Sequence, residues 1–315
     1  MSARPSISPS PTTSQRASRT PGLAVAAILG AAACWGALGV SYELIGRHVD
    51  VEPVTLVTIR ASAAAIILLI VSTFSRTIGS DLAALRRPSI AAAVVAMGLI
   101  STAAFYVMLI YAYHEAGVAV ATVLLYVAPT IVAVMAWVAY RLPVSRSQQV
   151  ALLVSFAGVI GVAAGSGSVG GSSTIGIVLG LLSAVTYASY SLIARFALQR
   201  LSTTFVVTAS LAVGAVALWV VKLVVDGPSL PSAAGVGLIA LVNGVGTTIT
   251  PMLLYTWGLR KIGPSRASLL ATAEPAIAEI LAFALPGERM SLILAGGALA
   301  IAAGVVIGSL ARGQR

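Results

Sequence analysis

The chain of 315 residues is 58% apolar and only 9% charged, and its mean hydropathy is +1.01. Soluble domains are about half apolar and about a quarter charged, so this composition excludes a soluble globular protein. A net charge of +10 would suggest nucleic-acid binding in a soluble chain, but basic residues also collect in the cytoplasmic loops of membrane proteins. No basic run exceeds two residues, so we expect a membrane protein with no nucleic-acid partner.

The first segment, residues 1–21, is rich in Ser, Pro, Thr and Arg. Such a composition cannot bury apolar area, and no short apolar stretch with a cleavage site follows it. The segment is predicted to be a disordered cytoplasmic tail rather than a signal peptide.

Ten apolar runs follow the tail. A helix needs about 20 residues to cross ~30 Å of hydrocarbon, and each run has roughly this length. The breaks between the runs carry Arg, Asp, Glu, Pro, Ser or Gly, as expected of turns at a membrane surface. The runs cover residues 22–44, 54–75, 89–111, 117–140, 148–166, 174–194, 203–225, 233–256, 264–286 and 290–311.

The basic residues predict the orientation of these helices. If the amino terminus is cytoplasmic, fifteen Lys and Arg residues lie on the cytoplasmic side, against only Arg47, Lys222 and Arg289 on the other. Cytoplasmic segments of membrane proteins carry such an excess. Arginine far outnumbers lysine, which is typical of a GC-rich bacterial genome. We expect a multi-pass protein of the bacterial cytoplasmic (inner) membrane with both termini cytoplasmic. Lys222 is expected to reach the outer interface from the end of its helix.

The two halves of the chain repeat each other. A shift of 146 residues pairs Gly98 with Gly244, Thr102 with Thr248, Gly117 with Gly263 and Pro129 with Pro275. The predicted repeats cover residues 22–166 and 174–311, joined by an uncharged Gly/Ser stretch. Each holds five helices, an odd number, so equivalent helices cross the membrane in opposite directions. The predicted fold is an all-α membrane protein of about ten transmembrane helices in two inverted five-helix repeats.

Several short motifs resemble the EamA-type transporters of the drug/metabolite transporter superfamily. They are Trp35-Gly36 in the first run, Arg60 early in the second, the stretch 254–267, Glu274-Pro275 in the ninth and Gly287-Glu288 after it. The resemblance covers residues 22–311. It implies two inverted five-helix bundles around a central cavity, no cofactor, and export or exchange of small metabolites. Members of one fold carry different cargoes, so the resemblance does not name the substrate.

Glu274 is the main candidate for function. It lies near the middle of the ninth run, directly before Pro275, and proline leaves backbone polar groups free to face a cavity. A carboxylate at this depth is costly and marks a possible substrate or proton site. The alternative is a structural carboxylate bonded to neighbouring helices.

Arg60 and Glu279 lie at similar depths below the outer surface, and an ion pair between them would lower the burial cost of both. A gating or structural pair is favoured over a ligand site. Glu274 and Glu279 are five residues apart and project about 140° apart on a helix, so they are not expected to serve one ligand.

Uncharged polar and aromatic residues deep in the runs are candidates for lining a cavity, although each is more often a packing residue. These candidates are Trp35, Tyr126, Tyr187, Tyr190, Asn243 and Thr247.

Other functional classes fit less well. Cys34 is the single cysteine, which excludes a disulfide and a cysteine-based zinc site, and no catalytic motif or metal-ligand cluster lies within a run. We expect neither an enzyme nor a metal site. A channel remains an alternative, although channels usually build polar rings by oligomeric symmetry. A flippase for a lipid or lipid-linked sugar is the closer alternative.

The sequence therefore predicts a secondary active transporter that moves a small organic metabolite, such as an amino-acid-like compound, by alternating access. Export is the expected direction, because of the family resemblance. The expected partners are the small-molecule substrate, membrane lipid and protons, and the chain holds no P-loop for ATP. The substrate's identity and the oligomeric state stay open at this stage.

Overall fold

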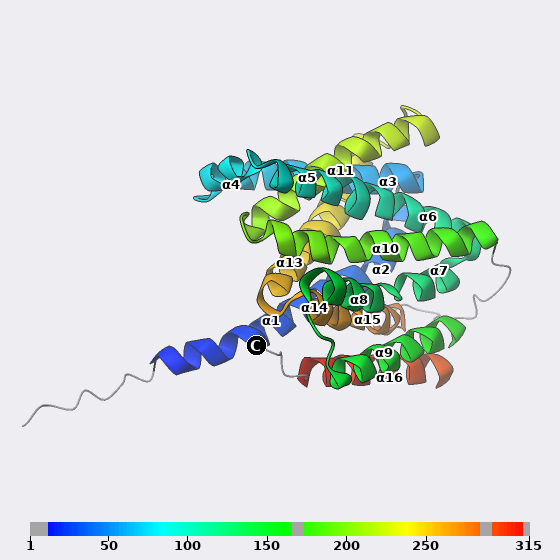
Figure 1. Ribbon diagram of the computed structural model, residues 1–315. Coiled ribbons are helices and arrows are strands. Elements are labelled where there is room, and N and C mark those ends of the chain that lie inside the picture. Colours follow the sequence, from blue (N-terminus) through cyan, green and yellow to red (C-terminus); the bar gives the residue numbers. More distant parts are fainter. Residues whose placement is uncertain (1–11, 166–172, 284–291, 311–315) are drawn as a thin grey trace, which may run out of the picture.

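The computed structural model describes residues 12–165, 173–283 and 292–310, and every regular element in these ranges is a helix (Figure 1). Helices are expected because a backbone in lipid must satisfy its hydrogen bonds internally. The first half contains α1 (Thr12–Gly36), α2 (Leu38–Gly46), α3 (Pro53–Thr73), α4 (Ile78–Leu85), α5 (Pro88–Ala96), η1 (Met97–Ala104), α6 (Phe105–Ala116), α7 (Val118–Leu125), α8 (Ala128–Tyr140) and α9 (Arg146–Gly165). The second half contains α10 (Thr174–Ala197), α11 (Thr203–Val225), α12 (Ala233–Ile239), η2 (Ala240–Ile249), α13 (Thr250–Ile262), α14 (Pro264–Ala271), α15 (Ala273–Phe283) and α16 (Leu292–Leu310).

The predicted membrane spans are confirmed as helices. Eight helical spans among the described residues are long and apolar enough to cross a membrane, from 22–46 through 233–262. The described parts of the two remaining predicted crossings are also helical, in α14–α15 and in α16, which holds a shorter apolar helix over 295–310. The short helix α4 lies between two of these spans.

The amino-terminal segment differs from its prediction as a disordered tail. Helix α1 begins at Thr12, so the described part of this segment, residues 12–21, is helical. The physical reason is that adding a turn to an existing helix costs far less than nucleating a new one. Residues 1–11 lie outside the described residues, as do the predicted joint at 166–172 and Glu288.

The repeat is visible in the helix boundaries. Under the shift of 146 residues, α6 ends one residue before Gly117 and α13 one residue before Gly263. These glycines adopt φ of 80° and 82°, a conformation that residues with a side chain rarely adopt. The π-helical segments η1 and η2 also lie at nearly equivalent places.

Both halves contain a broken helix at the same place. Helix α7 ends at Leu125 and α14 ends at Ala271, and the second segment of each pair carries a proline, Pro129 or Pro275, in its first turn. Proline is tolerated there because the first backbone donors of a helix lack partners inside the helix. The break places Tyr126 and Glu274 beside an interrupted helix rather than in the middle of a continuous one.

Small residues allow the closest helix contacts. Helices α9 and α16 lie side by side at one edge of the molecule (Figure 1), and a Cβ atom on Gly158 would lie 2.7 Å from the carbonyl oxygen of Gly297. Close approach through small residues is typical of helix pairs in membranes, where the lipid gives no hydrophobic drive for association.

Candidate functional site

A cavity of about 740 Å³ lies among helices of both halves. Its wall is largely aromatic. The side chains of Arg60 and Glu274 also line the wall. Pockets for small organic molecules typically measure about 300–1,000 Å³ and are mostly apolar with a few polar groups. The aromatic lining residues are Trp35, Tyr42, Phe105, Tyr106, Tyr111, Tyr113, Tyr126, Tyr187, Tyr190 and Tyr255.

The cavity reaches the surface at one end, which we call the mouth. The lining residues there are Glu52, directly before α3, His114 in the last turn of α6, and Asp226, directly after α11. Glu52 and His114 are exposed. The mouth is therefore the route by which a solute can enter the cavity.

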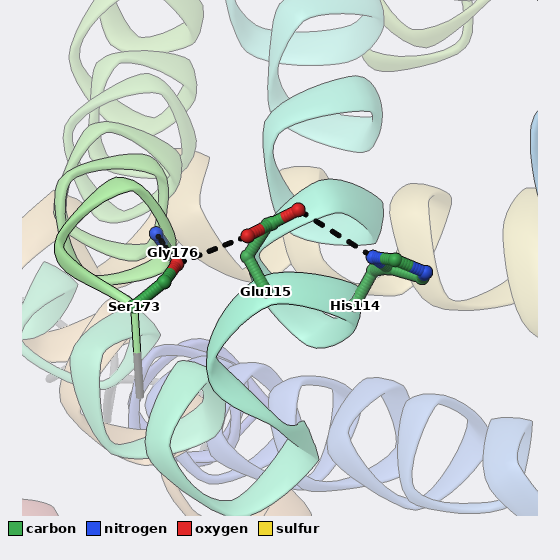
Figure 2. Close-up of polar contacts among 4 residues, drawn as sticks. All are labelled: His114, Glu115, Ser173 and Gly176. Atoms are coloured by element: carbon green, nitrogen blue, oxygen red, sulfur yellow. Dashed lines mark hydrogen bonds and ion pairs between the residues drawn. The ribbon is translucent and has the colours of Figure 1, made fainter. Parts of the chain in front are cut away.

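Polar contacts fix the rim of the mouth (Figure 2). The Ser173 hydroxyl donates to the Glu115 carboxylate at 3.0 Å and accepts a hydrogen bond from the backbone N–H of Gly176 at 3.0 Å. His114 Nδ1 lies 3.6 Å from the other carboxylate oxygen of Glu115. Glu115 thus joins the end of α6 to the start of α10, because Ser173 is the N-cap of α10.

Glu274 faces the cavity from the first turn of α15, after the helix break. Its carboxyl group is half-buried, and the Tyr126 hydroxyl lies within hydrogen-bonding reach of it. The Tyr113 and Tyr187 hydroxyls lie close enough to interact with it electrostatically. The structure therefore brings Glu274 together with Tyr126 and Tyr187, which were predicted to line a cavity, and with Tyr113, which the sequence analysis missed.

Gly36 explains how α1 reaches this site. A Cβ atom on Gly36 would lie 3.0 Å from the backbone oxygen of Glu274 and 3.1 Å from the backbone nitrogen of Ala278. The absence of a side chain lets α1 pack against α15 and brings the neighbouring Trp35 ring to the cavity wall. The Trp-Gly motif thus has a packing role and a lining role at adjacent positions.

Arg60 is 4% exposed and lies on the cavity wall. Its Nη1 donates to the Tyr42 hydroxyl at 3.0 Å, its guanidinium carbon lies 4.5 Å from the Tyr106 ring centroid, and its buried Nε has no hydrogen-bond partner. Aromatic rings stabilise a desolvated cation through their electron-rich faces. The partners of Arg60 on the cavity wall are thus two tyrosines. The ion pair of Arg60 with Glu279 stays a prediction. Among the described residues, Glu279 does not line the cavity.

The end of the cavity opposite the mouth is closed by a floor, which we define as Tyr190, Ser191, Tyr255 and Thr256. The Tyr190 and Thr256 hydroxyls are 2.8 Å apart, and the Ser191 and Tyr255 hydroxyls are 2.7 Å apart. The Trp35 and Tyr255 ring centroids lie 5.5 Å apart. These contacts join α10 to α13, so the floor is a hydrogen-bonded seam between two helices.

Two predicted residues lie behind the wall instead. Asn243 and Thr247 are buried in η2, and neither is among the described residues that line the cavity. Asn243 Nδ2 donates to the Ser41 hydroxyl at 2.9 Å, which joins η2 to α2. The Thr247 hydroxyl donates to the Asn243 carbonyl oxygen within η2 at 3.2 Å. Any role of the two residues in coupling stays a prediction.

Lys222 is fully buried, which corrects the expectation that it reaches the outer interface. Its ammonium group donates to the carbonyl oxygens of Gly227 and, at 2.5 Å, Ser229 in the loop after α11. The reason is that this loop folds back over the helix end and supplies carbonyl acceptors, so the side chain is satisfied inside the protein.

Two aspartates that the sequence analysis did not single out hold the amino termini of α3 and α11. Asp226, directly after α11, contacts the start of α3, and Asp81, in α4, contacts the start of α11. Asp226 accepts hydrogen bonds from the backbone N–H and hydroxyl of Thr55 at 2.7 and 2.6 Å. Asp81 accepts the same two kinds of bond from Ser202 at 2.8 and 2.7 Å. Each carboxylate thus caps the amino terminus of one helix of the pair, where negative charge is stabilising. These contacts join residues 171 and 121 positions apart in the sequence, so only the tertiary structure reveals them.

Comparison with known proteins identifies a transporter family and a relative named as a transporter. The model of the EamA-like transporter family matches residues 22–164 and again residues 174–310. An uncharacterized transporter from Archaeoglobus fulgidus is 31% identical over 135 residues, which is 42% of this chain and 47% of that protein. The chain thus spans about half the length of this relative.

The fold also resembles a protein of known crystal structure. The two share a TM-score of 0.74 over 90% of this chain and 95% of the other, with 18% sequence identity. At this identity the likeness concerns the fold alone.

Proposed function

The chain belongs to the EamA-like transporter family, and from this premise we propose that it is a secondary active transporter for a small organic metabolite. The observation that carries the proposal is the 740 Å³ cavity, open at the mouth and closed at the floor. A binding site reachable from one side only is what one state of an alternating-access transporter requires.

The orientation follows from the charges. With both termini in the cytoplasm of a bacterial cell, the ends of α10 and α13 face the cytoplasm and the mouth faces outward, because basic residues favour the cytoplasmic side. The floor is then a cytoplasmic gate that is closed in this conformation. Export would require the floor to open and the mouth to close, and a gating pair of Arg60 with Glu279 would form in that other conformation.

Glu274 is proposed to couple transport to protons or to contact the substrate. Its half-buried carboxyl group faces the cavity near three tyrosine hydroxyls, and a carboxylate within a membrane-spanning bundle is a natural place for proton exchange. The aromatic wall offers stacking surfaces for a flat or apolar part of the substrate.

Metabolite efflux tests the proposal. Cells that overproduce the wild-type chain are compared with cells producing equal amounts of Glu274→Gln, and the exported compounds are profiled by mass spectrometry. The exposed Asp50→Asn serves as a matched control, since it also removes one carboxylate but lies outside the cavity.

We expect a few small compounds to leave the cells faster when the wild type or Asp50→Asn is overproduced than when Glu274→Gln is overproduced. Normal, pH-sensitive efflux by Glu274→Gln would refute the coupling role. If no soluble compound responds, a flipping assay in lipid vesicles tests the alternative of a lipid or lipid-linked sugar cargo.

A further inference from the structure

A second, smaller pocket lies between α10 and α13 at the end of the molecule opposite the mouth. It measures about 200 Å³ and is lined by Arg195, Leu198, Gln199, Leu259 and Arg260. Helix α10 starts at the mouth beside Glu115 (Figure 2) and has 24 residues, which at 1.5 Å per residue carries its end about 36 Å away. The pocket therefore lies near the boundary between membrane and water.

Two arginines supply its charge. The Arg195 guanidinium lies 5.3 Å from the centroid of the Tyr140 ring and is half-buried, whereas Arg260 is exposed. Within the described ranges, neither guanidinium makes a hydrogen bond or an ion pair with another side chain. Each thus keeps its N–H donors free for a ligand.

Among the described residues at this end of the helices, few carboxylates could neutralise the two arginines. In the segments 76–87, 141–146, 195–202 and 260–266, Asp81 is the one acidic residue. Both of its oxygens already accept hydrogen bonds from Ser202. The charge of the pocket is therefore available to an external anion.

The pocket sits directly below the floor. Arg195 follows Ser191 by four residues on α10, and Arg260 follows Thr256 by four residues on α13. Residues four apart share one face of a helix. Closing the floor therefore draws two positive charges toward each other across the same seam, and an anion between them would offset this repulsion.

We propose that this pocket binds a phosphate-type oxyanion that bridges Arg195 and Arg260 and holds the floor closed. Guanidinium groups pair with phosphate oxygens in a two-point geometry, and basic pockets between transmembrane helices bind anionic headgroups. The phosphate comes either from an anionic lipid headgroup or from solution. The binding of the anion to the pocket does not depend on the proposed transport function. The effect of the bound anion on the floor rests on that proposed function.

Native mass spectrometry and thermal unfolding of the purified protein test the binding. The probes are short-chain phosphatidylglycerol, phosphatidylcholine and inorganic phosphate. Arg195→Gln and Arg260→Gln are compared with Arg146→Gln and Arg200→Gln, which remove a charge at the same end but outside the pocket. Because Arg260 is exposed, its variant is expected to fold even if the variant at Arg195 does not.

We expect phosphatidylglycerol, and not phosphatidylcholine, to remain bound and to raise the unfolding temperature. Each pocket substitution should weaken binding about fivefold, the effect of one basic residue near an anionic headgroup. Binding of inorganic phosphate at the same arginines would identify a free anion as the ligand. The proposal is overturned if no anionic probe binds, or if all four variants lose binding equally.

Transport assays in vesicles of phosphatidylglycerol or phosphatidylcholine test the anion site separately from the proposed transport function. If the anion binds but transport is equal in both lipids, the site stands and its control of the floor is refuted. If no transport occurs in any lipid while binding persists, the proposed function fails and the binding site does not.

Discussion

At the scale of single residues, the charged side chains inside the helix bundle each have specific partners. Arg60 is stabilised by two tyrosines, Glu274 by the Tyr126 hydroxyl, and Lys222 by backbone carbonyls. A charge in a membrane interior is costly, so each is held by groups that accept or share that charge.

Gly36 offers a direct test of the packing at the site. Gly36→Ala would place a Cβ atom 3.0 Å from the Glu274 backbone oxygen and 3.1 Å from the Ala278 nitrogen. We expect a loss of about 1–3 kcal/mol of stability, as for other overpacked positions, measured by unfolding in detergent. Gly39→Ala is the control, because nothing lies within 4 Å of its added methyl group. Equal stability of the two variants would contradict the close contact of α1 with α15.

Tyr255→Phe tests the floor. The substitution removes the hydroxyl that pairs with Ser191 and leaves the ring beside Trp35 in place, so stability should fall by only about 1 kcal/mol. We expect the floor to open more often. The readout is maleimide labelling of Leu109→Cys, a half-buried cavity position, in a Cys34→Ala background.

Labelling of this cysteine by an impermeant reagent should occur from the mouth side in both proteins. From the opposite side, in inverted vesicles, it should be faster with Tyr255→Phe than without it. Indistinguishable rates from that side would show that the Ser191–Tyr255 bond does not hold the floor.

At the scale of elements, the interrupted helices determine where polar groups can lie. Helices α7 and α14 stop at equivalent places, and the prolines that follow prevent a continuous helix from forming. Helices α3 and α11 are continuous, and an aspartate caps each of them: Asp226, directly after α11, caps α3, and Asp81, in α4, caps α11. These bonds lie at opposite ends of α11, while α10 and α13 meet through the hydrogen-bonded floor.

Asp226→Ala should loosen the contact between the end of α11 and the start of α3, and Asp81→Ala should loosen the contact between α4 and the start of α11. Each removes two hydrogen bonds at a helix amino terminus, and the loss of one cap costs about 0.5–2 kcal/mol. Thermal unfolding measures the change. Asp50 is exposed, and Asp50→Ala should leave the unfolding temperature unchanged. An equally unchanged unfolding temperature for Asp81→Ala and Asp226→Ala would contradict the role of these two residues as caps.

At the scale of the whole molecule, the two halves enclose one cavity that is open at one end. Helices from both halves line it, since Arg60 and Tyr126 come from the first and Tyr255 and Glu274 from the second. Under the proposed function, a rearrangement of one half against the other would exchange the open and closed ends, because equivalent helices cross in opposite directions.

The outer helix pair gives a test at this scale. Gly297→Val would bring a side chain within 2.5 Å of the Val162 backbone nitrogen and 2.7 Å of the Gly158 oxygen. We expect α16 to separate from α9 and the unfolding temperature to fall. Gly296→Val is the control, since its added Cβ atom would meet nothing within 4 Å. If both variants unfold at the same temperature, the close contact of α9 and α16 does not contribute to stability.

The sequence by itself determined the fold class, the number of crossings and the repeat. These properties depend on local composition and spacing: apolar runs must span a fixed thickness of lipid, and glycines and prolines at matching positions stop equivalent helices. Glu274, Arg60 and Trp35 could be selected as candidates for the same reason, because polar or large aromatic groups inside an apolar run stand out without any knowledge of neighbours.

The tertiary structure alone decided which residues meet. Ser191 and Tyr255 are 64 positions apart, Asp81 and Ser202 are 121 apart, and Thr55 and Asp226 are 171 apart. No local pattern encodes such pairs, because they depend on how helices pack. For the same reason the sequence did not reveal that Asn243 and Thr247 lie behind the wall, that Lys222 is buried, or that Arg195 and Arg260 share a pocket.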